Sequence, residues 1–131
     1  MKRLVYTVSA MAVIASAVSC ARSIQQQCQD GVNATCQLLA RCADGGATVT
    51  MTSNGCTVGA GSFALTFGTL PDGGPQCFSG MTAADVCNGN GDGGSTYNAS
   101  NDDQCIAAIQ GATCDKASTI AQQPPCSTVC Q

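Results

Sequence analysis

The chain has 131 residues, a formal net charge of −3, eleven cysteines, and neither histidine nor tryptophan. This length suits one domain, and the scarcity of lysine and arginine excludes the basic surface that nucleic-acid binding needs. After Cys20 the balance is more acidic, because three cations face eight aspartates.

The first predicted element is a secretion signal over residues 1–19. Met1-Lys2-Arg3 is positive, residues 4–18 are uncharged and mostly apolar, and small residues follow. A charged region, an apolar region and a small-residue exit together define a secretory signal peptide. Because a membrane-spanning helix needs roughly 20 apolar residues, we expect a cleaved signal here.

Two kinds of cleavage fit the end of this signal. An ordinary signal peptidase would cut after Ala17 or after Ala21. The segment Ala17-Val18-Ser19-Cys20 also resembles the lipobox of bacterial lipoproteins. That resemblance implies a diacylglyceryl group on the sulfur of Cys20 and cleavage just before it. Cleavage after Ala17 would leave an odd thiol, whereas lipidation of Cys20 or cleavage after Ala21 leaves ten cysteines to pair.

A lipidated Cys20 would anchor the protein strongly, since it carries two acyl chains and stable attachment takes two. Residues 20–27 would then be the lipidated cysteine and a short tether, reaching at most about 25 Å. The remaining residues, 28–131, form the predicted domain.

The ten other cysteines are predicted to be structural disulfides. A structural zinc site or a redox motif would call for closely spaced pairs such as Cys-x-x-Cys, often with histidine. The chain has no histidine and no Cys-x-x-Cys, and only Cys126-x3-Cys130 comes near this spacing. Leu, Ile, Val and Phe make up only roughly 15% of the residues after Cys20, less than a robust core needs. Disulfides at about 2–4 kcal/mol each would compensate. The pairing stays open, and the cysteines concerned are Cys28, Cys36, Cys42, Cys56, Cys77, Cys87, Cys105, Cys114, Cys126 and Cys130.

The first half of the domain predicts one helix and a small sheet. Asn33 is a candidate cap for a short helix ending near Ala43. Residues 47–67 alternate apolar and polar side chains, as half-buried strands do. Asn54-Gly55 between two such runs predicts a hairpin. We expect two or three short strands, with Phe63 and Phe67 in the core.

The second half predicts three short helices. Thr82 and Asp85 form one capping-box pattern, and Ser100 with Asp103 forms another. The first of these patterns opens a short helix that runs through Cys87. The second precedes a helix over 103–110 that stops at Gly111, and a last helix is expected over 115–122. The expected fold class is therefore α+β: a small disulfide-stapled domain with short helices and a short β-hairpin or three-stranded sheet.

Two weak patterns suggest ligand or catalytic chemistry. Residues 88–93 read Asn-Gly-Asn-Gly-Asp-Gly, similar to the start of a calcium loop. Asp102 and Asp103 form an adjacent carboxylate pair, but acids also favour a helix start electrostatically. We predict no catalytic residues, no metal site and no cofactor.

Cysteine density after the lipobox resembles the small cysteine-rich envelope lipoproteins of Gram-negative bacteria. This resemblance implies a non-enzymatic structural or interaction module at the cell surface or in the periplasm. Its partners would be the membrane, through the lipid on Cys20 at the outer membrane or cell surface, and another envelope protein, but no nucleic acid. The alternative is a soluble secreted effector or inhibitor; a small hydrolase-type enzyme and a calcium-binding module fit less well.

Overall fold

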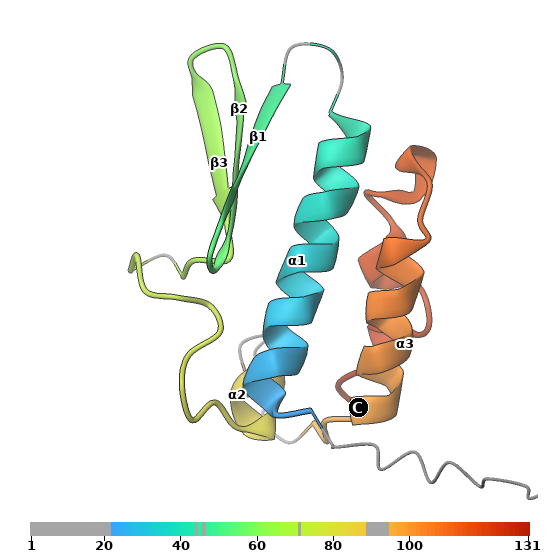
Figure 1. Cartoon of the computed structure of the whole chain (residues 1–131). Helices are drawn as coiled ribbons and strands as arrows, with labels where there is room; N and C mark the ends of the chain where they lie inside the picture. The colour runs from blue at the N-terminus through green and yellow to red at the C-terminus, as the bar shows by residue number, and fades with distance from the viewer. Residues whose placement is uncertain (1–21, 44, 46, 71, 89–94) are drawn as a thin grey trace, which may run out of the picture.

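A long helix, α1 (Ile24–Cys42), forms the centre of the fold, with a sheet on one side and a second long helix on the other (Figure 1). The computed structural model describes residues 22–43, 45, 47–70, 72–88 and 95–131. The sheet, α3 and Cys77 in the segment before α2 are each attached to α1 by close packing or by a disulfide.

α1 begins nine residues before the predicted start at Asn33. Ser23 caps it: the Ser23 side chain accepts from the Gln26 amide, and the Gln26 side chain accepts from the Ser23 amide. This capping box satisfies two amides that would otherwise lack partners. The predicted tether is consequently wrong for residues 24–27, which form the first turn of α1, and Asn33 lies inside the helix.

The sheet contains three antiparallel strands in the order β1 (Ala47–Thr52), β2 (Gly55–Ala60) and β3 (Phe63–Phe67). The predicted first hairpin is confirmed, but its turn is shifted by one residue. Thr52 pairs with Gly55, so Ser53 and Asn54 form the turn and Gly55 begins β2.

The two faces of the sheet differ in composition. Residues directly opposite in antiparallel strands lie on the same face, and Cys56 points to α1 because it is bonded to Cys36. The face toward α1 is apolar. Three rows of paired residues form it, each with one residue from every strand: Ala47, Ala60 and Phe63; Val49, Val58 and Leu65; and Met51, Cys56 and Phe67. The opposite face carries Thr48, Thr50, Thr52, Thr57 and Thr66.

Only β1 and β2 pack closely on α1, so β3 extends beyond the helix. Phe63 is 62% exposed and Leu65 is 48% exposed. The expectation that Phe63 fills the core is therefore wrong, and Phe67 is half-buried. The reason is tertiary: the apolar pattern of β3 is that of a half-covered strand, but α1 covers only the neighbouring strands β1 and β2.

Two further helices follow the sheet. α2 (Ala83–Asn88) starts with the predicted capping box, in which the Thr82 amide donates to Asp85 Oδ2 over 2.7 Å. α3 (Ala99–Gln110) starts four residues earlier than expected, because Asn98 Oδ1 accepts from the Asn101 amide at 3.1 Å. Gly111 ends α3 as predicted.

The C-terminal tail lies back over α3. Its three short 3-10 turns are η1 (Cys114–Lys116), η2 (Ile120–Gln122) and η3 (Cys126–Thr128). The helix predicted over 115–122 is wrong, in line with the weak helix propensity of Ser118 and Thr119 in its middle. Backbone hydrogen bonds join the segment before α3 to the end of the chain, including one from the Asn98 amide to the Val129 carbonyl over 2.8 Å.

α1 and α3 run in parallel. At their N-terminal ends Arg22 donates to Asp103 over 2.7 Å. At their C-terminal ends Arg41 donates to the Gln110 carbonyl over 3.0 Å, which satisfies an end-of-helix acceptor.

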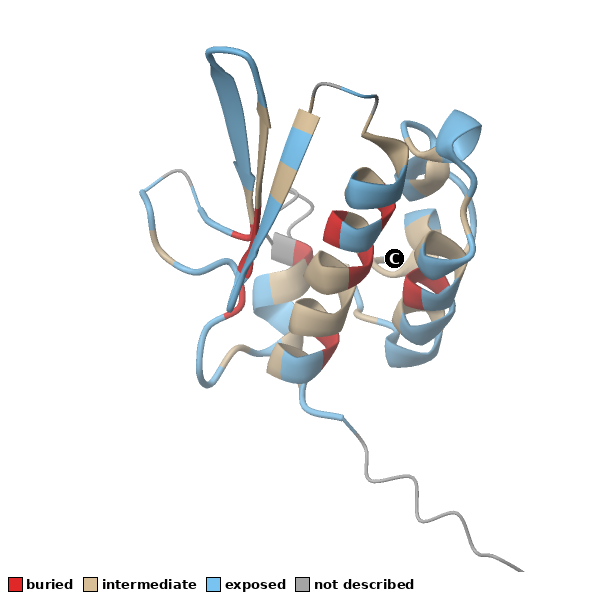
Figure 2. Ribbon diagram, turned by 45° about the horizontal axis from the view of Figure 1, so that its top comes forward, coloured by how far each residue is buried: buried red, intermediate tan, exposed pale blue. Residues whose placement is uncertain are grey.

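Five disulfides hold these elements together, as the composition predicts. They are Cys28–Cys77, Cys36–Cys56, Cys42–Cys114, Cys87–Cys130 and Cys105–Cys126. Among the described residues, the buried apolar set is Ala34, Cys36, Leu38, Cys56, Cys77, Cys87, Cys105 and Ile106. Five of these eight are disulfide cysteines, so the core is built around sulfur as much as hydrocarbon (Figure 2). The α+β, disulfide-stapled fold class is confirmed.

Candidate functional site

The most developed concavity is a groove with a volume of about 800 Å³, within the range of ligand pockets. Its walls come from α1, α3, the end of β3, α2 and the connecting segment 68–82. The lining residues are Gln27, Cys28, Gly31, Val32, Thr35, Phe67, Leu70, Gln76, Phe78, Met81, Asp85, Val86, Asp102, Cys105, Ile106 and Ile109.

The Cys28–Cys77 disulfide positions one wall of the groove. It brings the two Cα atoms within 5.7 Å, so the irregular segment 68–82 is held against α1. Phe78 follows Cys77 directly and lines the groove. Without this bond few contacts would fix the segment, since its described backbone bonds are mostly within its own turns.

The floor of the groove comes from two parallel helices. On α1, residues 28, 31, 32 and 35 recur at the three- and four-residue spacing of one helix face. On α3, Ile106 and Ile109 do the same, and Ile106 is buried. The floor is therefore apolar and rigidly supported.

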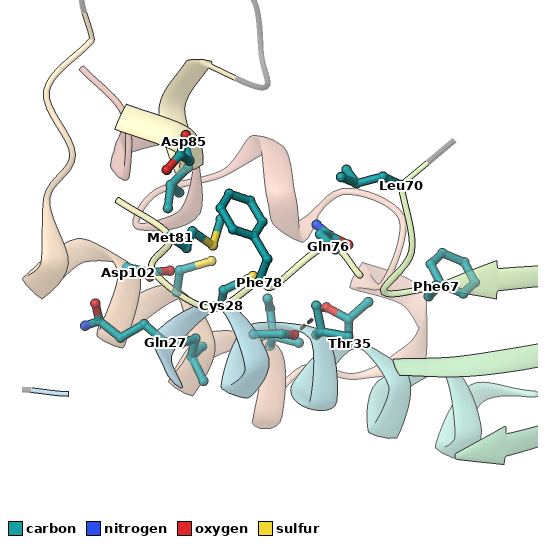
Figure 3. Close-up of a pocket in the computed structure, with 16 residues that line it drawn as sticks. Gln27, Cys28, Thr35, Phe67, Leu70, Gln76, Phe78, Met81, Asp85 and Asp102 are labelled. Atoms are coloured by element: carbon teal, nitrogen blue, oxygen red, sulfur yellow. Dashed lines mark hydrogen bonds between the residues drawn. The ribbon is translucent and has the colours of Figure 1, made fainter. Parts of the chain in front are cut away.

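Two apolar side chains at the wall remain accessible. Leu70 is 41% exposed and Phe78 is 37% exposed. Figure 3 shows Leu70 and Phe67 near one end of the groove, with Phe78 and Met81 further along it. Apolar side chains left open beside a concave apolar floor are typical of a binding surface.

The other end of the groove is acidic. Figure 3 shows Asp85, Asp102 and Gln27 on this side. Hydrogen bonds from the Thr82 side chain and backbone amide hold the pKa of Asp85 below its ordinary value. Asp102 Oδ2 lies 2.7 Å from the Tyr97 hydroxyl. Asp85 is therefore ionised at neutral pH, while its carboxylate faces solvent.

Gln27 connects this end to the interior of the fold. It is 4% exposed, and its Nε2 donates to Asp103 Oδ1 at 3.3 Å. The Tyr97 hydroxyl lies 2.6 Å from Gln27 Oε1, so one phenolic proton serves Gln27 and Asp102. Burial, and next the bond to Asp102, raise the pKa of Tyr97. The network orders the N-terminal ends of both helices.

The predicted carboxylate pair is divided between two tasks. Asp102 lines the groove, whereas Asp103 accepts from Arg22, which also bonds Asp30 over 2.7 Å. The bond to Asp30, followed by the charge of Asp103, raises the pKa of Arg22. The two adjacent aspartates thus do not converge on one reacting centre.

The remaining sequence candidates lie elsewhere. Cys20 and residues 89–93 of the calcium-like pattern fall outside the described residues. Cys126 and Cys130 bond to α3 and α2 rather than to each other. Within the described part of the chain, no three His, Cys, Asp or Glu side chains gather around a possible metal position. None of the described helices combines the length and hydropathy needed to cross a bilayer.

Sequence reasoning missed the groove altogether. Its lining comes from segments far apart in the chain, and Val32, Phe78 and Met81 carry no motif. One signal would have helped: knowing that Cys28 pairs with Cys77 places segment 68–82 over the first helix. That pairing is not readable from spacing.

No known protein family matches the chain, and no curated protein sequence or solved structure is significantly similar to it. The assignment of function consequently depends on the geometry and the chemistry of the groove.

Proposed function

We propose that this protein is an exported, non-enzymatic binding module, held at a membrane by a lipid on Cys20, and that the groove is its binding site. The observation that carries the proposal is an open apolar groove with a charged end, on a scaffold held by five disulfides. Five disulfides suit an oxidising, exported location.

The early start of the folded domain supports a role close to the membrane. Arg22 already pairs with Asp30 and Asp103, and it lies only two residues after Cys20. Two extended residues span about 7 Å, so a lipid on Cys20 would keep the N-terminal ends of α1 and α3 at the lipid surface. The hairpin turn between β2 and β3 lies at the opposite end of the domain (Figure 1).

The composition of the groove supports binding rather than catalysis. Among its described lining residues, the ionisable groups are Asp85 and Asp102, and its two cysteines are in disulfides. Thr82 bonds the first carboxylate and Tyr97 the second, so each is oriented by a neighbouring residue of the domain.

The anchor is tested by the intact mass of the mature protein purified from membrane and medium fractions. A lipidated Cys20 adds several hundred daltons, and reduction adds about 10 Da, two hydrogens for each disulfide. A mature chain that starts at Val18 with an unmodified Cys20, or one that starts at Arg22 in the medium, would contradict the anchor; the latter would favour a secreted effector.

The groove is tested with a neutral apolar dye, Nile red, added to the oxidised domain. We expect saturable fluorescence that is lost in Phe78→Ser and Leu70→Ser. Phe63→Ser and Leu65→Ser are matched controls, because these residues are exposed apolar side chains that do not line the groove. Equal losses in all four variants, or no saturable binding to the parent protein, would contradict the binding module.

A further inference from the structure

We propose that the groove selects an extended peptide segment of a partner protein, one that places a basic residue at the Asp85–Asp102 end and apolar residues along Val32, Phe78 and Leu70. This inference rests on the proposed function and specifies the ligand of the same site. Its two components are the charge at one end of the groove and the apolar lining along the remainder.

No cation of the described domain lines the acidic end of the groove, although the charge of Arg22 also acts on Asp102 from outside it. The described cations are Arg22, Arg41 and Lys116, and none of them lines the groove. Arg22 is paired with Asp30 and Asp103, and Arg41 donates to carbonyls at the end of α3. Asp85 and Asp102 thus face the groove with no cation among its described lining residues, and a ligand that brings one would pair with them.

Asp85 is well suited to receive that cation. Its Oδ2 is occupied by the Thr82 amide and hydroxyl, both at 2.7 Å, which fixes the orientation of the carboxylate. Oδ1 has no described partner and is free to accept a lysine ammonium or an arginine guanidinium. A carboxylate already oriented by its own helix cap loses little side-chain entropy when it binds.

The apolar lining requires more than a simple cation. Val32, Ile106 and Ile109 form the floor, and Phe78, Met81 and Leu70 form the wall. Charge and apolar surface are separated along the groove, as Figure 3 shows for Asp85 and Asp102 against Phe67 and Leu70. A ligand must therefore carry its cation and its apolar groups at separate positions along its length.

An extended peptide meets this requirement with the least adjustment. Alternate residues of an extended chain point to the same side, so a Lys-x-Leu-x-Phe segment presents one basic and two apolar side chains to the groove. Leu70 and Phe78 are partly exposed at the wall of the groove, so it is open to solvent beside them, which leaves room for the rest of a partner chain to enter and leave.

The test is a nuclear magnetic resonance titration of the isotope-labelled, oxidised domain with acetyl-Lys-Ser-Leu-Ser-Phe-amide. Two matched peptides replace Lys with Gln or with Glu. We expect the dissociation constant to rise from Lys to Gln to Glu, by about tenfold over the series. Shifted resonances should include Val32, Phe78 and Val86.

Variants assign the preference to its residues. Asp102→Asn keeps an acceptor for Tyr97 while removing the charge, and Asp85→Asn removes the second charge. The double variant should bind the Lys and Glu peptides within about twofold of each other, because the attraction of exposed charges is lost. Asp115→Asn is the matched control, since it removes one exposed carboxylate outside the groove and should leave the preference unchanged.

The outcomes separate this inference from the proposed function. Equal affinity for all three peptides would overturn the choice of a basic residue and leave the groove as a binding site. No shift at groove residues with any peptide would overturn the peptide ligand, and the Nile red experiment would then decide the groove by itself. A preference that persists in the double aspartate variant would also contradict the proposal.

Discussion

The helical body, comprising α1, α2, α3 and the tail 111–131, differs from the sheet of β1, β2 and β3 in how it is held. Four of the five disulfides have both ends in the body or in the segment 68–82 packed on it, whereas one, Cys36–Cys56, reaches the sheet. Buried side chains cluster along α1 and at its contact with β2, while β3 is mainly exposed (Figure 2).

This difference shows how a chain with few large apolar residues stabilises its two parts in different ways. The body relies on covalent links between short elements, and the sheet relies on hydrogen bonds between strands with one covalent attachment. The sheet is thus expected to be the first unit to open, since it has fewer buried contacts and fewer constraints.

Removal of Cys36–Cys56 by a Cys36→Ser/Cys56→Ser double variant gives the largest expected effect on the sheet. The two cysteines are 20 residues apart in the sequence, and both are fully buried. We expect a loss of about 3 kcal/mol in the free energy of unfolding. Amide hydrogen exchange should accelerate in residues 47–67 far more than in α3.

Cys42→Ser/Cys114→Ser is the control for this experiment, because it removes a bond within the body. Amide hydrogen exchange in the sheet should be slower in this variant than in Cys36→Ser/Cys56→Ser. If the strands remain equally protected in both double variants, the contrast between body and sheet is wrong.

Gly68→Ala tests the tight junction at the end of the sheet. Gly68 has a φ of +89°, and an added Cβ would lie 2.1 Å from the Asn54 carbonyl oxygen. We expect a loss of about 2–3 kcal/mol from steric displacement and backbone strain, measured by chemical denaturation.

Gly73→Ala separates these two causes. Its φ of +84° is similar, but nothing lies within 4 Å of the added Cβ. This variant should lose only about 1–2 kcal/mol, the cost of the left-handed conformation. Equal losses for both variants would mean that the contact with Asn54 is not what constrains Gly68.

Tyr97→Phe tests how the stability of the helical body depends on pH. Removing the hydroxyl leaves the buried Gln27 without that donor, and we expect a loss of about 1 kcal/mol at neutral pH. The pKa of Tyr97 is raised above its ordinary 10.0. Its contribution is therefore complete below pH 10 and is lost as the pH rises through the higher folded value.

The parent protein should accordingly lose stability above pH 10 more steeply than Tyr97→Phe, as measured by denaturant midpoints from pH 8 upward. Parallel pH curves for the two proteins would contradict the role assigned to the Tyr97 hydroxyl. At acidic pH both proteins should lose stability in the same way. Folding lowers the pKa of Asp85, so its contribution to stability is present above its ordinary pKa of 3.8 and is lost as the pH falls below that value.

Phe63→Ser gives the smallest expected effect. The side chain is 62% exposed and lies on the strand farthest from α1. We expect a change within about 0.5 kcal/mol. By contrast Leu38→Ala, at a side chain 3% exposed on α1, should cost about 2–5 kcal/mol. Thermal unfolding of both variants measures the contrast, and a comparable loss at Phe63 would show that β3 is packed.

The sequence by itself determined the local features of this protein. The hairpin after Thr52, the capping box at Thr82 and Asp85, and the stop at Gly111 depend on neighbouring residues, so their chemistry is visible in a short window. The count of cysteines and the lack of large apolar residues likewise predicted a domain held by disulfides, because composition decides how much core a chain can form.

Only the tertiary structure decided which cysteines pair, which apolar strand is left uncovered, and where a groove forms. Cys28 meets Cys77 across 49 residues, and ten cysteines allow about nine times the 105 pairings of eight. Phe63 and Val49 have the same alternating pattern, yet one is exposed because α1 covers β1 and β2 rather than β3. Such outcomes depend on where distant segments are held, which spacing along a chain does not encode.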